Sequence, residues 1–261
     1  MEILSIEHAT IRKDGKTLLN DVSWKVKQGE HWAILGLNGS GKTMLLNMIN
    51  GYTWPTSGTV QVLGKTFGTY PLGELRKSIG WVSSSLTERL YEDDYAENII
   101  LSGAFASFGL YEEVSQSQID KALAIMTELG CDSFINRPYS SLSQGEKQRI
   151  LIGRALMAEP KILILDEPCT GLDIFAKEQL LGTVDKLAKR ENAPSIIYVT
   201  HHTDEILPLF NRVLCIRDGA VFAAGEREKL LTEESLSAFF NYPIRLHTIG
   251  NRSYLTLDRS I

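Results

Sequence analysis

A glycine-rich segment in the first fifth of the chain has the residue types that bind a nucleotide phosphate. Residues 36–43 read Gly-Leu-Asn-Gly-Ser-Gly-Lys-Thr and fit the pattern GxxxxGK[ST]. Glycines allow consecutive backbone N–H groups to turn inward around a phosphate, and a following helix presents its positive end to the same group. The segment therefore predicts a site for the phosphates of ATP, with a glycine-rich turn that binds nothing as the alternative. The predicted ATP-binding residues are Gly36, Asn38, Gly39, Ser40, Gly41, Lys42 and Thr43.

Two side chains of this loop have distinct chemical tasks. Lys42, at the end of what we expect to be a solvent-facing loop, would reach the β- and γ-phosphates. The hydroxyl group of Thr43 would ligate Mg²⁺. An apolar run before the loop and a helical pattern after it favour the phosphate site over the simple turn.

Two adjacent carboxylates later in the chain supply what ATP hydrolysis needs. Asp166 and Glu167 directly follow the apolar run 162–165. In α/β proteins, ligands bind at the C-terminal ends of the strands, where such residues lie. Asp166 would hold Mg²⁺ through its water shell, and Glu167 would be the general base that activates the attacking water. An exposed acidic turn is the alternative, but the phosphate loop in the same chain favours the catalytic interpretation.

The spacing of apolar residues predicts the elements that position these side chains. The first thirty residues alternate apolar and polar, which predicts antiparallel β-structure with a turn at 14–16. Strands that alternate with helices then predict a parallel sheet covered on both faces. Residues 94–157 have helical character and are predicted to form an inserted lobe. The predicted short strands are 31–35, 59–63, 79–83, 162–165, 195–200 and 213–216, and the predicted helices are 42–50, 177–188, 205–209 and 234–240.

One pentapeptide resembles the signature of a known family. Residues 142–146 read Leu-Ser-Gln-Gly-Glu, which resembles the signature of the ATP-binding cassette (ABC) superfamily, at that family's usual interval before the acidic pair. The resemblance covers nearly the whole chain. It implies an α/β fold: a RecA-like P-loop NTPase core with an antiparallel β subdomain and an inserted helical subdomain. The implied single ABC ATPase domain, 1–261, has a core at 1–84 and 160–225, a helical insertion at about 85–159 and a C-terminal extension at 226–261.

The resemblance also implies roles for residues outside the phosphate loop. In a head-to-tail dimer, Ser143, Gln144 and Gly145 would contact the γ-phosphate of ATP held by the partner chain, as a helix N-terminus favours. Without the other motifs, the same residues could be only a helix cap. Asp173 would cross the dimer interface beside the partner's phosphate loop. His201, after the predicted strand 195–200, would contact the γ-phosphate and help to position the attacking water as a catalytic residue.

Two positions depart from the family's pattern. Lys13 stands where the family usually has an aromatic residue that stacks on adenine, although a cationic side chain can lie over a purine face. Ser84 stands where the family usually has a Gln that touches Mg²⁺ and whose loop meets the transporter's membrane domain. The shorter Ser84 is therefore assigned only a weak metal contact through a bridging water.

Composition and charge limit the partners of this ATPase. The 261-residue chain has a formal net charge of -5, so we expect no direct nucleic-acid partner. Its three scattered cysteines disfavour a zinc site or a disulfide framework. The longest mostly apolar run, 99–111, is too short to span a membrane, and no signal-peptide pattern follows Met1. The predicted location is cytoplasmic, with a peripheral position on the inner face of the cell membrane where a permease binds the chain.

Two uses of ATP hydrolysis stay open at this point. The C-terminal segment 231–244 resembles the end of ATPases that serve importers of siderophore, haem, cobalamin or molybdate type. This favours the ATP-binding subunit of an importer for a small chelated metal or oxyanion, with membrane permease subunits as partners. Ser84 keeps open a soluble ATPase that acts on a protein or nucleic-acid machine. Both uses require ATP and Mg²⁺ as cofactors and a homodimer that forms on ATP binding.

Overall fold

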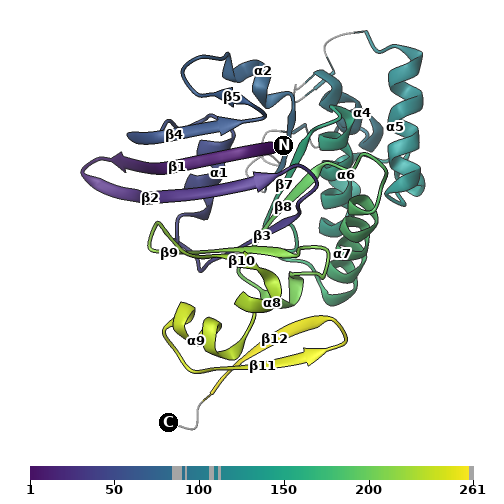
Figure 1. The fold of residues 1–261 in the computed structure, drawn as a ribbon. Coiled ribbons are helices and arrows are strands. Elements are labelled where there is room, and N and C mark those ends of the chain that lie inside the picture. The colour runs from purple at the N-terminus through teal and green to yellow at the C-terminus, as the bar shows by residue number, and fades with distance from the viewer. Residues whose placement is uncertain (84–89, 92, 106–108, 111–112, 259–261) are drawn as a thin grey trace. The chain divides into compact units, whose positions relative to one another are not determined.

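The computed structural model describes residues 1–83, 90–91, 93–105, 109–110 and 113–258 of the chain (Figure 1). These residues form two compact units, one of 1–76 with 195–261 and the other of 77–194. The second unit includes the strands at 79–82 and 162–166, although the sequence predicts them as part of the core. These two strands pair with each other, and the first of them packs on a helix of the insertion. The predicted subdomain boundaries at 84/85 and 159/160 stay a prediction.

An antiparallel sheet in the first unit confirms the strand pattern of the N-terminal residues. β1 and β2 form the predicted hairpin, and Asp14 and Gly15 in its turn have φ angles of 50° and 74°. Both values lie in the left-handed region, as the two central residues of a type I′ hairpin turn require. The sheet has the order β2-β1-β4-β5. Its strands are β1 (Glu2–Lys13), β2 (Lys16–Lys27), β4 (Ser57–Val62) and β5 (Lys65–Thr66).

A second group of strands in the first unit brings two predicted site segments to one edge. β3 (Trp32–Leu35) lies parallel to both β8 (Ser195–Thr200) and β9 (Arg212–Arg217), and β10 (Ala220–Glu226) lies antiparallel to β9. Every residue of β3 and β8 is buried, as expected for parallel strands covered on both faces. The C-terminal ends of β3 and β8 point the same way, so the residues after them meet at one edge.

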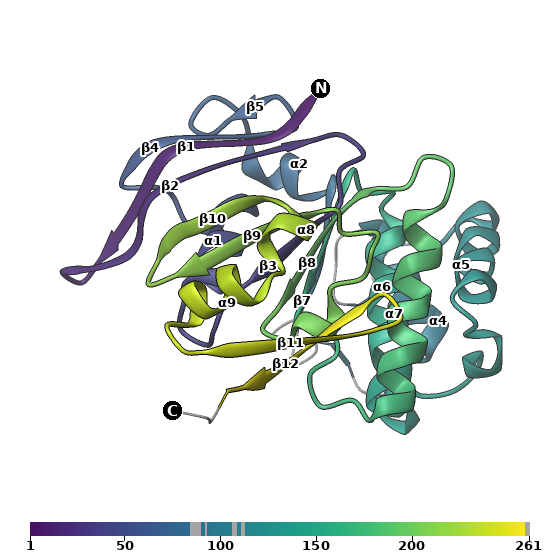
Figure 2. The same ribbon diagram turned by 60° about the horizontal axis from the view of Figure 1, so that its bottom comes forward.

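Short helices and a C-terminal hairpin complete the first unit. The hairpin of β11 and β12 is drawn in yellow in Figures 1 and 2 and is antiparallel throughout. α1 follows β3 and buries its apolar side against the unit. These elements are α1 (Lys42–Ile49), α2 (Leu72–Arg76), the 3₁₀ turn η4 (Thr203–Glu205), α8 (Arg227–Leu230), α9 (Glu233–Phe240), β11 (Ile244–Ile249) and β12 (Arg252–Leu257).

The predicted helix at 205–209 is wrong. Only the 3₁₀ turn η4 forms at its beginning. Pro208 has no backbone N–H to donate, so it cannot continue the hydrogen-bond pattern of a helix. The Glu205 carboxylate is buried and accepts a hydrogen bond from the Thr200 hydroxyl at 2.7 Å.

The second unit is mostly helical and confirms helical character within 94–157. β6 and β7 are parallel, and α6 packs against α4, α5 and β6. Gly103 permits the close approach to α6, because a Cβ atom there would lie 2.0 Å from the carbonyl oxygen of Arg154. The elements are β6 (Ile79–Val82), α4 (Ala96–Ser102), η1 (Gly103–Phe105), α5 (Gln116–Glu128), η2 (Asp132–Phe134), η3 (Tyr139–Ser141), α6 (Gln144–Met157), β7 (Ile162–Asp166) and α7 (Ile174–Ala188).

The three cysteines are buried thiols. Cys131, Cys169 and Cys215 are each buried and in the thiol form. Burial raises the pKa of Cys131 to about 11 and that of Cys215 to about 12. These two thiols are therefore protonated at neutral pH, and a thiol is a poor nucleophile compared with its thiolate. Among the residues that the structure describes, no helix is long and apolar enough to cross a membrane.

Candidate nucleotide-binding site

The loop between β3 and α1 has the backbone shape of a phosphate cradle. Gly39 and Gly41 have φ angles of 80° and 106°, which residues other than glycine rarely adopt. Gly36 is required for a different reason, because a Cβ atom there would lie 2.4 Å from Ser40 Oγ and 2.8 Å from the carbonyl oxygen of Ile216. Gly36, Gly39 and Gly41 thus each meet a steric demand, and the loop leads into the N-terminus of α1.

Lys42 is buried, contrary to the expectation that it faces solvent. Its side chain folds back over the loop, where Nζ donates to the carbonyl oxygens of Gly36 at 2.7 Å and Leu37 at 3.1 Å. Carbonyl oxygens accept hydrogen bonds from an ammonium group without neutralising its charge. Thr43, the next residue, is exposed. A hydroxyl oxygen suits Mg²⁺, so Thr43 fits the predicted metal contact.

The turn between β9 and β10 forms backbone hydrogen bonds with the phosphate loop, a contact that the sequence did not indicate. The Gly219 N–H donates to the carbonyl oxygen of Ser40 at 2.9 Å, and the Asn20 N–H donates to the carbonyl oxygen of Gly219 at 2.8 Å. A cavity of about 210 Å³ lies along the loop, lined also by the end of β9 and by Phe239 and Phe240 of α9. The C-terminal extension therefore lies beside the phosphate loop.

Lys13 lies at the end of β1, opposite Lys16 in the hairpin, and its side chain is exposed. The neighbouring part of β2 does reach the loop, because a Cβ atom at Gly41 would lie 3.1 Å from Leu19 Cδ2. The hairpin is thus next to the nucleotide loop, and the contact of Lys13 with adenine stays a prediction.

His201 leaves the sheet at the same level as the phosphate loop. Leu35 pairs with Thr200 in the parallel register of β3 and β8, so Gly36 and His201 are the next residues of the two strands. The His201 side chain is half-buried, and its ring lies 4.1 Å from the exposed ring of His202 between centroids. The structure therefore brings the predicted phosphate ligands and His201 to one edge of the first unit.

The acidic pair of the second unit lies at the end of β7, and Glu167 has a left-handed backbone. β7 is buried up to Leu165, and Asp166 and Glu167 are half-buried at its C-terminal end. Glu167 has a φ angle of 49°, in the left-handed region. For a residue other than glycine, this conformation costs about 1–3 kcal/mol of conformational free energy, and such residues cluster at functional sites. The conformation agrees with a catalytic role for Glu167, and the carboxylate oxygens of Asp166 suit Mg²⁺.

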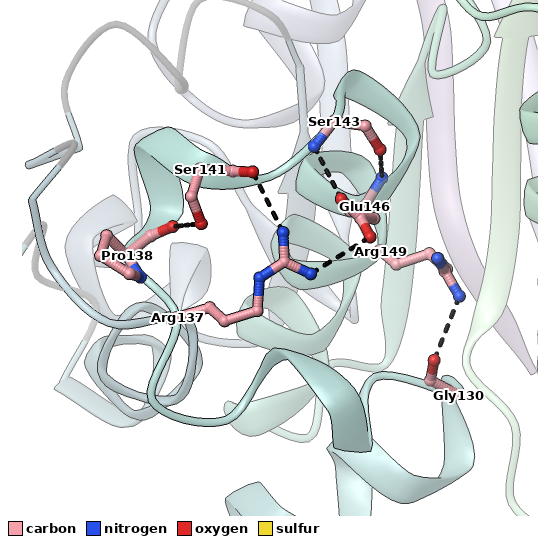
Figure 3. A network of polar contacts seen from close by, with 7 residues as sticks. All are labelled: Gly130, Arg137, Pro138, Ser141, Ser143, Glu146 and Arg149. Carbon is pink, nitrogen blue, oxygen red and sulfur yellow. Dashed lines mark hydrogen bonds and ion pairs between the residues drawn. The ribbon is translucent and has the colours of Figure 1, made fainter.

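The signature residues form the capped start of α6, shown in Figure 3. Ser143 N donates to Glu146 Oε2 at 2.7 Å, and Glu146 N donates to Ser143 Oγ at 3.4 Å. Arg137 braces this capping box: its Nη2 donates to the carbonyl oxygen of Ser141 at 3.1 Å, and its Nη1 lies 3.5 Å from Glu146 Oε1. Ser143 and Gln144 are exposed, as contact with a partner's nucleotide requires.

The charge of Glu146 maintains the capping box. Burial acts to raise the pKa of Glu146, but hydrogen bonds from Ser143 and the charges of Arg137 and Arg149 outweigh it and hold the pKa below its usual value. A carboxyl group with a lowered folded-state pKa adds stability above its unfolded pKa and loses it only as the pH falls through the folded value. The cap is therefore intact at neutral pH.

Gly145 and Asp173 have structural tasks in addition to those predicted. Gly145 is buried where α6 meets α7, and a Cβ atom there would lie 3.0 Å from Ala176 Cβ. Asp173 caps α7, since its Oδ1 accepts from the N–H groups of Phe175 at 2.8 Å and Ala176 at 2.9 Å. Their contacts with a partner's ATP stay predictions. Ser84 lies outside the described residues, so its metal contact also stays a prediction.

Comparison with known proteins identifies related sequences over the whole chain. The profile of the ABC transporter family matches residues 19–170. The uncharacterised ABC transporter ATP-binding protein YlmA of Bacillus subtilis is 51% identical over 255 residues, which cover 97% of each chain.

Solved structures of similar fold are ABC cassettes. A metal-chelate type ABC transporter in an inward-facing conformation matches with a TM-score of 0.81 and 23% identity over 100% of this chain and 99% of its own. The cbiO1 protein of Clostridium perfringens, part of the cbiONQ transporter complex, matches with a TM-score of 0.79 and 27% identity over 92% and 94%. A dimeric bacterial ABC transporter cassette matches with a TM-score of 0.73 and 25% identity over 85% and 98%.

Proposed function

The chain belongs to the ABC transporter family and is an ATP-hydrolysing cassette, and from this premise we propose that it powers an importer of a small chelated metal or oxyanion. One observation carries the proposal. The likeness to the metal-chelate type transporter extends over the whole chain, including the α9–β11–β12 extension, whereas the likeness to the dimeric cassette covers 85% of it. The extension is also where the sequence resembles metal-chelate importers.

For the ATPase reaction we propose these roles. The N–H groups of the phosphate loop and the Lys42 ammonium group bind the β- and γ-phosphates, whose charge an ammonium group stabilises during transfer. Glu167 accepts a proton from the attacking water, and His201 orients that water and the γ-phosphate. Thr43 and Asp166 would hold Mg²⁺, which neutralises charge that develops on the phosphate oxygens.

ATP closes two copies head to tail in this proposal, with Ser143 of each copy at the ATP of the other. Two exposed apolar side chains support such an interface. Ile174 and Phe175, directly after Asp173, are 68% and 80% exposed. Large apolar side chains that adjoin in this way are typical of protein interfaces.

Replacement of Phe175 by Asp is expected to weaken ATP-dependent dimerisation by at least about tenfold, because a charge would enter a desolvated interface. Analytical ultracentrifugation with Mg-ATP, in the Glu167→Gln background to prevent turnover, measures the dimer constant. The control is Leu123→Asp on the exposed side of α5, which should dimerise normally. Equal dimerisation of the Phe175 and Leu123 variants would contradict the placement of Phe175 in the interface.

The importer is tested with any membrane permease subunits that are found encoded beside the gene or that co-purify with the chain. In proteoliposomes, we expect these subunits to raise the ATPase rate of the wild-type chain and to support uptake of a ferric chelate, cobalamin or molybdate. Chains carrying Glu167→Gln should bind the same subunits without uptake. Robust ATPase activity in solution with no complex would instead favour an ATPase that acts on a protein or nucleic-acid machine.

A further inference from the structure

The C-terminal hairpin contacts the segment that directly follows His201. Thr203 Oγ1 donates a hydrogen bond to the carbonyl oxygen of Ser253 in β12 at 2.8 Å. Both residues are buried, with 3% and 5% of their surfaces exposed, and fifty positions separate them in the chain. A buried hydrogen bond of this kind has no water to replace it when one partner is lost.

A second contact joins the same two segments. Arg252 Nη1 donates to the carbonyl oxygen of Asp204 at 2.8 Å. At the turn of the hairpin, Arg227 Nη2 donates to the carbonyl oxygen of Asn251 at 3.1 Å, which ties the hairpin to α8. Hydrogen bonds from a guanidinium group are charge-assisted and stronger than neutral ones. The hairpin is thus anchored on η4 at two successive residues, through the Thr203 side chain and the Asp204 carbonyl oxygen.

Residues 202–205 also form hydrogen bonds with side chains of β8. The buried Glu205 carboxylate accepts from the Tyr198 hydroxyl at 3.1 Å and from the Thr200 hydroxyl at 2.7 Å. The His202 N–H in turn donates to Thr200 Oγ1 at 3.0 Å. Residues 202–205 are therefore fixed between β8 and β12, and the backbone next to His201 cannot shift without breaking one of these bonds.

We propose that Thr203 and Arg252 are positioning residues for His201, so that the C-terminal hairpin orients the histidine toward the γ-phosphate. The proposal rests on the role of His201 in hydrolysis proposed above. The reason is geometric: hydrolysis is sensitive to errors of about 1 Å in the placement of a reacting group. In this proposal Thr203 and Arg252 act through the backbone that carries the histidine.

The test removes one hydrogen bond at a time. Thr203→Val keeps the shape of the side chain and removes the hydroxyl group, and we expect kcat for ATP to fall about 3- to 10-fold, the value of one hydrogen bond. KM for ATP should stay within about twofold, because the phosphate loop is untouched. Thr203→Ser should restore kcat. Thr248→Val is the matched control, since Thr248 is an exposed threonine of the same hairpin.

Arg252→Met provides a second variant in case Thr203→Val folds poorly. We expect the same selective loss of kcat. Its matched control is Arg245→Met, because Arg245 lies in the partner strand of the hairpin and contacts Asp258 at 2.9 Å. Circular dichroism at the assay temperature checks that every variant is folded.

A double-mutant cycle separates positioning of His201 from general support of the fold. In a His201→Ala background, Thr203→Val and Arg252→Met should lower kcat no further, because the group that they position is gone. An equal loss with and without His201 would overturn the proposal. A His201→Ala chain with wild-type turnover would instead overturn the role of the histidine itself, so the two failures can be told apart.

Discussion

Glu167→Gln is expected to lower ATP turnover by about 10²- to 10⁴-fold while ATP binding persists, because an amide cannot accept the proton of the attacking water. Glu167 directly follows the buried strand β7 and has a left-handed backbone with φ of 49°. Glutamine has the same length and adopts this conformation about as readily as glutamate. A change in turnover would therefore report the carboxylate and not the backbone.

The same variant should accumulate as an ATP-bound dimer, since closure precedes hydrolysis in the proposed mechanism. Steady-state phosphate release measures turnover, and gel filtration with Mg-ATP measures the dimer. Glu191→Gln, at an exposed position of the same unit, is the control and should behave as wild type. A loss of turnover below tenfold, together with a monomeric elution volume, would show that Glu167 is not the general base.

Lys42→Ala is expected to weaken ATP binding by about 10- to 100-fold, because hydrogen bonds to charged groups contribute about 1.5–3 kcal/mol. Isothermal titration calorimetry measures the affinity. The substitution also removes the hydrogen bonds of Nζ to the carbonyl groups of Gly36 and Leu37, so the loop loses an internal contact as well as a charge.

Two further variants test whether the Lys42 ammonium group is needed for ATP binding. Lys42→Met keeps most of the aliphatic stem without the charge and should bind ATP as poorly as Lys42→Ala. Lys229→Ala, which removes an exposed lysine paired with Glu226 at 2.8 Å, should bind ATP normally. Wild-type affinity in both Lys42 variants, with the loop still folded, would contradict phosphate binding by Lys42.

Features that depend on neighbouring residues could be predicted from the amino-acid sequence. The phosphate loop is one example, because Gly39 and Gly41 supply the left-handed backbone angles within a few positions of each other. The β1–β2 turn at Asp14 and Gly15 is another. The capping box of Ser143 and Glu146 depends on a spacing of three residues, which is visible in the sequence. Each of these is a local steric or hydrogen-bonding requirement, and so a short pattern was enough to predict the element.

Features that join distant parts of the chain could not be predicted from the sequence and emerge from the three-dimensional fold. The helix predicted at 205–209 does not form. Instead, Glu205 is buried, and its carboxylate accepts hydrogen bonds from the Tyr198 and Thr200 hydroxyl groups. The anchoring of Thr203 on Ser253 had no counterpart in the sequence, because a hydroxyl–carbonyl contact leaves no pattern in residue type. Lys42 was predicted from its motif as a phosphate ligand, but its burial follows from carbonyl groups that the fold of the loop turns toward it. Residue types thus specify which groups can do the chemistry, whereas their orientation depends on long-range packing that a single sequence does not display.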